Sequence, residues 1–219
     1  MSKIGVIVSG GQIDKAFVDS FFETIEPEVV IAADSGMRYL YESGKRPTHI
    51  VGDFDSVARD ILDYYRSLDG IAIRQYNPVK DATDTEIAIR YAIELGVEKL
   101  WILGGTGSRI DHMLGNIQCL KIAKEENVEA YIVDGYNRVR LLGGDACIRK
   151  EDLFGPYFSV FPLGGEVKNV SIKGAKYPLH NHTLTPYDSR CVSNQPESET
   201  IQITFSEGDI IFVESKDEK

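Results

Sequence analysis

At the centre of the chain's organisation lies the segment His49-Ile50-Val51-Gly52-Asp53-Phe54-Asp55-Ser56. The apolar residues are typical of a short buried strand, and the glycine and aspartates are typical of the loop after it. Side chains at i and i+2 of an extended backbone share one face, so Asp53 and Asp55 are predicted to converge on one cation. Gly52 lets a ligand approach the main chain, and Phe54 is predicted to anchor the loop in the core. An ordinary turn explains the same residues, so the interpretation depends on the rest of the chain.

Around this segment, from Lys3 to Asp134, short β-branched runs alternate with longer amphipathic segments. This alternation is typical of repeated βαβ units. We therefore expect an α/β domain over residues 1–136, with a mostly parallel, Rossmann-like sheet flanked by helices. The predicted strands are Ile4–Ser9, Val29–Ala33, His49–Val51, Ile71–Gln75, Leu100–Leu103 and Ala130–Val133. The predicted helices are Lys15–Glu23, Met37–Ser43, Ala58–Leu68, Asp84–Leu95 and Asp111–Glu125.

After Asp134, glycine and proline punctuate shorter alternating runs, which indicates an antiparallel β domain over residues 137–219. Its predicted strands are Tyr157–Phe161, Val167–Ile172, Thr200–Phe205 and Asp209–Val213.

Composition limits the class of function. The chain has 219 residues, 42% of them hydrophobic, and a net charge of −10. This charge disfavours nucleic acid and anionic membranes as partners, and an anionic substrate would need a metal ion or a local basic group. The amino terminus does not read as a signal peptide or a membrane span, and the three cysteines lack the spacing of a disulfide framework or a zinc site. We therefore expect a cytoplasmic location.

Ligands of open parallel sheets bind beyond the carboxyl ends of the strands, so the loops there are the candidate site. The first, Ser9-Gly10-Gly11-Gln12, offers backbone N–H groups to phosphate without being a Walker A loop. The second holds Asp34, which either orients a ribose or metal-bound water or caps the next helix.

Two further loops carry charge. Thr83 and Glu86 have the spacing of a capping box that starts a helix at Asp84, and Asp81 is an additional acid outside the box. The run Gly104-Gly105-Thr106-Gly107-Ser108-Arg109 leaves room for phosphates and adds a planar cation, with Asp111 near the start of the next helix. His112 is interpreted as a packing or hydrogen-bonding residue. Acids and one arginine around glycine-rich turns favour a Mg²⁺ site for a polyphosphate.

These motifs, taken in order with Ala33-Asp34-Ser35-Gly36, Lys176-Tyr177-Pro178-Leu179 and Ser193-Asn194, resemble the thiamine pyrophosphokinase (thiamine diphosphokinase) family. The resemblance covers nearly the whole chain. It implies an α/β catalytic domain followed by a β-sandwich domain, and transfer of the pyrophosphoryl group of ATP to the hydroxyl of thiamine, giving thiamine diphosphate and AMP. It also implies a homodimer, with thiamine bound between the α/β domain of one subunit and the β domain of the other.

The resemblance assigns roles by position. Asp53, Asp55 and Asp84 would bind Mg²⁺, with Asp81 beside them. Arg109 and Asp111 would contact nucleotide or phosphate, and these six residues form the expected catalytic set. Thiamine would meet Tyr177, Ser193 and Asn194. The residues expected to bind ATP are Gly11, Asp34, Gly52, Ser56, Thr83, Gly104, Gly105, Gly107, Ser108 and Arg109.

Three departures from the family pattern concern Ser35, Ala82 and the Arg190-Cys191 pair, and none removes a carboxylate. Two alternatives remain open at this point. One is a pyrophosphokinase for another hydroxymethyl heterocycle such as a pterin, and the other is a nucleotide-sensing module without turnover.

Overall fold

The structure, a computed structural model, describes residues 2–55, 57–76 and 82–218. The chain divides into two compact units, residues 1–135 and 136–219. Within the described residues, no helix combines the length and the apolar character needed to cross a membrane.

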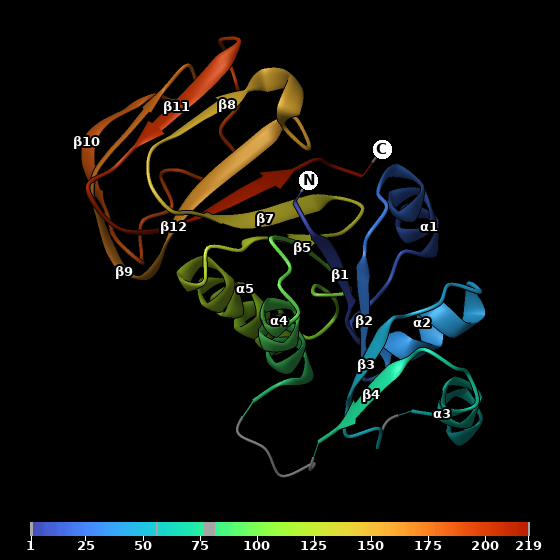
Figure 1. Ribbon diagram of the computed structural model, residues 1–219. Helices are drawn as coiled ribbons and strands as arrows, with labels where there is room; N and C mark the ends of the chain where they lie inside the picture. Colours follow the sequence, from blue (N-terminus) through green and yellow to red (C-terminus); the bar gives the residue numbers. More distant parts are fainter. Residues whose placement is uncertain (1, 56, 77–81, 219) are drawn as a thin grey trace. The chain divides into compact units, whose positions relative to one another are not determined.

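The first unit is built on a parallel sheet with the strand order β4-β3-β2-β1-β5-β6 (Figure 1). Its strands are β1 (Ile4–Val8), β2 (Val29–Ala33), β3 (His49–Gly52), β4 (Ala72–Gln75), β5 (Lys99–Leu103) and β6 (Glu129–Val133). The strand order reverses between β1 and β5, which is where open α/β sheets place their ligand crevice. The predicted α/β fold is confirmed.

Helices cover both faces of this sheet, α4 and α5 on one side and α1, α2 and α3 on the other (Figure 1). Their bounds are α1 (Lys15–Thr24), α2 (Gly36–Glu42), α3 (Arg59–Arg66), α4 (Asp84–Glu94) and α5 (Ile110–Glu125). Strand β2 is buried along its whole length because helices pack on both of its faces. This buried centre fixes the strand ends from which the candidate site is built.

The start of α4 follows the predicted capping box in part. The Thr83 hydroxyl accepts a hydrogen bond from the Glu86 N–H at 3.2 Å. The Glu86 carboxylate instead accepts from Arg90 Nε at 2.9 Å. One side-chain cap therefore suffices to begin the helix at Asp84, as the sequence predicts.

The second unit is antiparallel, as predicted. Its strands are β7 (Asn137–Leu142), β8 (Ala146–Arg149), β9 (Tyr157–Lys173), β10 (Leu179–Leu184), β11 (Thr200–Thr204) and β12 (Glu207–Ser215), with a short 3₁₀ helix, η1 (Lys150–Asp152), after β8. They pair in the order β7-β12-β9-β11-β8, and β10 also pairs with β9. Side chains from all six strands, including Phe158 and Phe212, form one core.

The strand prediction was wrong for this unit at β9 and incomplete elsewhere. Two runs predicted as separate strands belong to the single strand β9, which continues through Gly164. The amino-terminal part of β9 pairs with β12 and its carboxyl-terminal part with β10 and β11. A glycine at φ +75° within β9 is therefore a bend and not a chain reversal. Strands β7, β8 and β10 were not predicted.

Candidate active site

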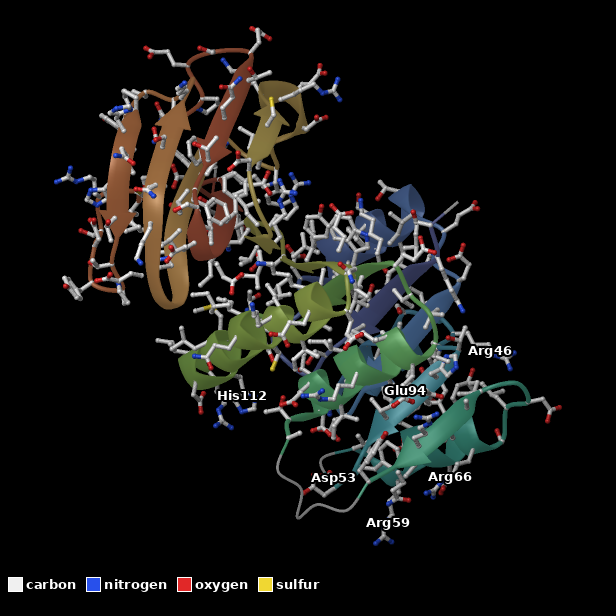
Figure 2. All side chains as sticks on the ribbon, turned by 60° about the vertical axis from the view of Figure 1, so that its left-hand side comes forward. Arg46, Asp53, Arg59, Arg66, Glu94 and His112 are labelled. Atoms are coloured by element: carbon white, nitrogen blue, oxygen red, sulfur yellow. The ribbon has the colours of Figure 1, made fainter. Side chains whose placement is uncertain are left out.

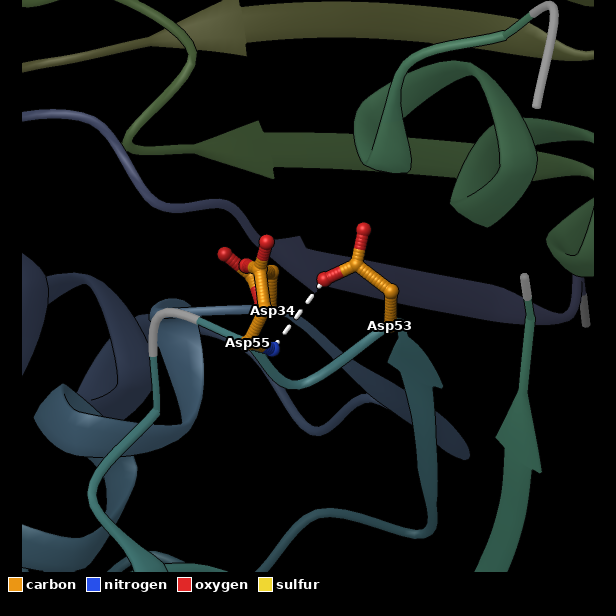
Figure 3. A group of neighbouring side chains, drawn as sticks. All are labelled: Asp34, Asp53 and Asp55. Carbon is orange, nitrogen blue, oxygen red and sulfur yellow. Dashed lines mark hydrogen bonds between the residues drawn. The ribbon is translucent and has the colours of Figure 1, made fainter. Parts of the chain in front are cut away.

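Three carboxylates from two neighbouring loops lie together in the first unit (Figure 3). One oxygen from each of Asp34, Asp53 and Asp55 lies within 4.8 Å of the others. The Asp55 N–H donates to Asp53 Oδ1 at 3.2 Å. The pKa of Asp55 is raised, first by its hydrogen bond with Asp53 and then by the negative charge of that neighbour. Such mutual repulsion is what a shared cation would relieve.

The backbone reason given for this convergence was wrong, although Asp53 and Asp55 do lie together. Strand β3 ends at Gly52, and Phe54 adopts φ +67°, which is left-handed and not extended. The Phe54 side chain is only 7% exposed, so its predicted role as a core anchor is confirmed. Burial of the ring therefore offsets the cost of a conformation that bulky residues rarely adopt.

Asp34 reaches the group because the loops after β2 and β3 pack closely. Asp34 itself has φ +46°, and its N–H donates to Val51 O at 2.9 Å. A Cβ on Gly52 would lie 3.2 Å from Asp34 Cα, so glycine permits this approach. The N-terminal cap position of α2 is Ser35, with no side-chain cap bond. Asp34 thus adjoins the paired aspartates.

A cleft of about 740 Å³ opens beside Asp34, at the carboxyl ends of β1, β2 and β5. Most of its lining comes from the loops after these strands and from the first turns of α4 and α5. It includes the predicted residues Gly11, Asp34, Thr83, Asp84, Gly104, Gly105, Gly107, Ser108 and Arg109. The loops after β1, β2 and β5 and the start of α4 therefore meet in one cavity, whereas Gly52, Asp53 and Asp55 are not part of its lining.

The two glycine turns in the cleft pack against each other. The Gly11 N–H donates to Gly104 O at 3.0 Å, so this amide serves the turn and not a phosphate. A Cβ on Gly11 would lie 2.3 Å from the carbonyl oxygens of both Gly104 and Thr106. Glycine is needed here for the contact between two backbones.

Several supporting residues were missed by the sequence reasoning. The buried Asn116 donates from Nδ2 to Gly105 O at 2.8 Å, and Ser9 and Thr85 share a buried hydrogen bond of 2.6 Å. Thr106 Oγ1 donates to Asp134 Oδ2 at 2.8 Å. The sequence signal for Asn116 was its polar side chain within the predicted helix Asp111–Glu125.

Arg109 brings positive charge to the cleft. Its guanidinium donates to both oxygens of Asp111, at 2.6 and 3.2 Å. This partner lowers the pKa of Asp111 to about 2, so both groups are charged at neutral pH.

Arg59 and Arg66, on α3, point outward (Figure 2). The interpretation of His112 as a packing or hydrogen-bonding residue was wrong as regards packing, because its side chain is exposed and lines the cleft from the first turn of α5.

The remaining predicted positions divide as follows. Asp84 lines the cleft but is not in the close carboxylate group, where Asp34 stands instead. Ser56 and Asp81 lie outside the described residues. In the second unit, Tyr177 and Asn194 are joined by hydrogen bonds, and Ser193 precedes Asn194 with φ +55°.

Comparison with known proteins gives the same family for both units of the chain. Residues 24–132 match the family described as "Thiamin pyrophosphokinase, catalytic domain", and residues 146–210 match "Thiamin pyrophosphokinase, vitamin B1 binding domain". Thiamine pyrophosphokinase of Bacillus subtilis is 30% identical over 211 residues, covering 96% of this chain and 98% of that protein.

Solved structures extend the similarity to the fold. The crystal structure of thiamine pyrophosphokinase from Bacillus subtilis superposes with a TM-score of 0.87 at 28% identity, covering 99% of this chain and 100% of that one. The enzyme from Geobacillus thermodenitrificans gives a TM-score of 0.82 at 29% identity, with 99% of each chain covered. With both domain types matched in order and a near full-length relative at 30% identity, this chain belongs to the thiamine pyrophosphokinase family.

Proposed function

We propose that this protein is a thiamine diphosphokinase, which transfers the pyrophosphoryl group of ATP to the hydroxyl of thiamine and releases AMP. The observation that carries the proposal is a group of three carboxylates, one of which, Asp34, lines the same cleft as Arg109, in a member of this family. Transfer of this kind needs mainly positioning and neutralisation of charge. Carboxylates for a cation and an arginine for phosphate supply these two requirements.

The carboxylate oxygens suit Mg²⁺, a hard ion usually bound by one or two carboxylates together with substrate phosphates and water. Asp53 and Asp55 would hold it, with Asp34 beside them and Asp84 facing the adjoining cleft. Bound Mg²⁺ supplies charge neutralisation on the phosphates.

Arg109 would meet the phosphates in the cleft that it lines. Its fork geometry suits bidentate contact with a phosphate, and Asp111 keeps the guanidinium oriented until the nucleotide arrives. Close packing of Gly11 against Gly104 gives the cleft a floor without side chains.

The direct test is incubation with ATP, Mg²⁺ and thiamine while AMP and thiamine diphosphate are measured. The expected products are these two in equal amounts. ADP in place of AMP would rule out attack at the β-phosphorus. Product formed only with a hydroxymethyl pterin would move the proposal to another acceptor, and ATP binding without turnover would favour a sensing module.

A single substitution tests the metal assignment. Asp55→Asn removes one negative charge with little change of shape, and turnover is expected to fall about 10²–10³-fold, as when one stabilising group is lost from a transition state. Asp63→Asn, which changes an exposed aspartate on α3, is the matched control and should leave turnover unchanged. Near-normal activity of Asp55→Asn, with Mg²⁺ still required, would remove Asp55 from the metal site.

The proposal includes a homodimer, in keeping with the family resemblance, and a cytoplasmic location, in keeping with the spacing of the three cysteines. Sedimentation of the purified chain checks the first part, and a monomer that is fully active would contradict it. Fractionation of the source cells checks the second.

A further inference from the structure

The side chain of Asn194 is buried, with 3% of the residue exposed, and both ends of its amide bond backbone groups. Its Oδ1 accepts from the N–H groups of Tyr177 and Gln195, at 3.0 and 2.9 Å. Its Nδ2 donates to Tyr177 O at 2.8 Å. The amide therefore pairs with both backbone groups of Tyr177, as a neighbouring strand would.

Asn194 is itself fixed to the core of the second unit. Its backbone N–H and C=O pair with the C=O and N–H of Phe158, both at 2.9 Å. Phe158 lies in β9 and is fully buried. The N–H of the preceding residue, Ser193, donates to Ser159 Oγ at 3.0 Å. Asn194 is thus a short rigid link between β9 and the loop that contains Tyr177.

Tyr177, at the other end of this link, is 57% exposed although its backbone is held. Pro178 follows it and stiffens the loop. An exposed ring on an immobilised backbone loses little entropy when a ligand packs on it. A tyrosine face also attracts a cation such as the thiazolium of thiamine.

We propose that Asn194 is a positioning residue for the acceptor: it acts through Tyr177, whose ring it holds for thiamine, and does not touch thiamine itself. This inference rests on the proposed function. The Asn194 amide bonds protein groups at both ends and only 3% of the residue is exposed, whereas Tyr177 is 57% exposed and offers its ring to a substrate.

The substitution Asn194→Asp separates positioning from direct contact. It keeps the shape of the side chain but places a carboxylate oxygen against Tyr177 O, where Nδ2 stood. A direct contact with cationic thiamine would then hold or lower the KM for thiamine. Positioning through Tyr177 raises this KM about tenfold or more, as expected when a buried carbonyl loses its donor, and leaves the KM for ATP unchanged. An unchanged or lowered KM for thiamine overturns the proposal.

A double-mutant cycle tests whether the effect passes through Tyr177. Tyr177→Ala alters an exposed side chain, so the protein is expected to fold, and the KM for thiamine should rise while that for ATP does not. In this background, Asn194→Asp should add less than about twofold. Fully additive effects, or an unchanged KM in Tyr177→Ala, overturn the proposal. Asn169→Asp, whose exposed amide bonds Ser206 in the same unit, is the control and should change neither KM.

Amide hydrogen exchange tests the link without requiring activity. In Asn194→Ala, the amides of Tyr177 and Gln195 lose their acceptor and should exchange at least about tenfold faster, while the amide of Phe158 stays protected. Unchanged exchange at Tyr177 overturns the link itself. If the wild-type protein makes no thiamine diphosphate, the proposed function fails, and the exchange result still decides whether Asn194 holds Tyr177.

Discussion

Substitution of Gly36 by alanine perturbs the site from outside the predicted set of residues. Gly36 is the first residue of α2 and packs against Val8 at the end of β1. An added Cβ would lie 1.9 Å from Val8 O and 2.7 Å from Val8 C. These are backbone atoms and cannot rotate away, so α2 and β1 must separate by about 1 Å in a closely packed interior.

The magnitude follows from two opposing terms. Overpacking of this kind costs about 1–3 kcal/mol, and backbone neighbours place Gly36→Ala near the upper end. Alanine favours a helix over glycine by up to about 1 kcal/mol. The net expected loss is about 2 kcal/mol in the free energy of unfolding, or about 4–8 °C in Tm for a chain of this size. Because Ser9 and Gly10 follow β1 into the cleft, the KM for ATP should also rise.

Trp101, the chain's single tryptophan, lies in β5 of the same unit. Its fluorescence during urea unfolding therefore reports on that unit. The control is Gly115→Ala in α5, where an added Cβ meets nothing within 4 Å. This control should gain up to about 1 kcal/mol. Equal urea midpoints for Gly36→Ala and wild type would refute the reasoning.

Two further predictions concern the second unit. The hydrogen bond with His182 Nε2, 2.5 Å away, is the main cause of the lowered pKa of Asp188. The Asp188 carboxylate therefore stabilises the fold fully above the unfolded pKa of about 3.9, and this stabilisation is lost as pH falls through the folded pKa. Asp188→Asn should therefore have a lower Tm than wild type at pH 7, with a gap that closes below about pH 4; a gap independent of pH contradicts this. Arg138 binds the carboxylate of the fully buried Glu214 at 2.5 and 2.6 Å. Arg138→Met leaves this buried charge without its partner, so the free energy of unfolding should fall by about 3–5 kcal/mol, as measured by urea unfolding followed by circular dichroism. Adding Glu214→Gln should recover part of the loss, and no recovery contradicts the buried-charge explanation.

The helices and strands of the first unit could be predicted because their signals are local. Apolar periodicity and the Thr83 cap lie within one or two turns of the residues that they organise. In the second unit, the same rules predicted two strands, Tyr157–Phe161 and Val167–Ile172, whereas pairing with three other strands makes them one strand, β9, that continues through Gly164. Long-range pairing of this kind leaves no short-range signal.

The candidate site shows the same division. That the loops at the strand ends meet follows from the topology of parallel sheets, and the loops after β1, β2 and β5 do meet in the cleft. The inclusion of Asp34 with Asp53 and Asp55 depends on left-handed backbone at Asp34 and Phe54, which only tertiary packing selects. The engagement of Asn194 with the Tyr177 backbone is likewise invisible in the sequence.

The left-handed conformation of Phe54 bears on how this protein can be made more robust. Non-glycine residues in this region carry about 1–3 kcal/mol of strain. Glycine at this position would relieve the strain but would also remove a buried ring, which costs about 3–5 kcal/mol, so both stability and the placement of the aspartates would suffer. Searches for hardier variants should therefore spare this loop and begin at helix positions with open space, such as Gly115.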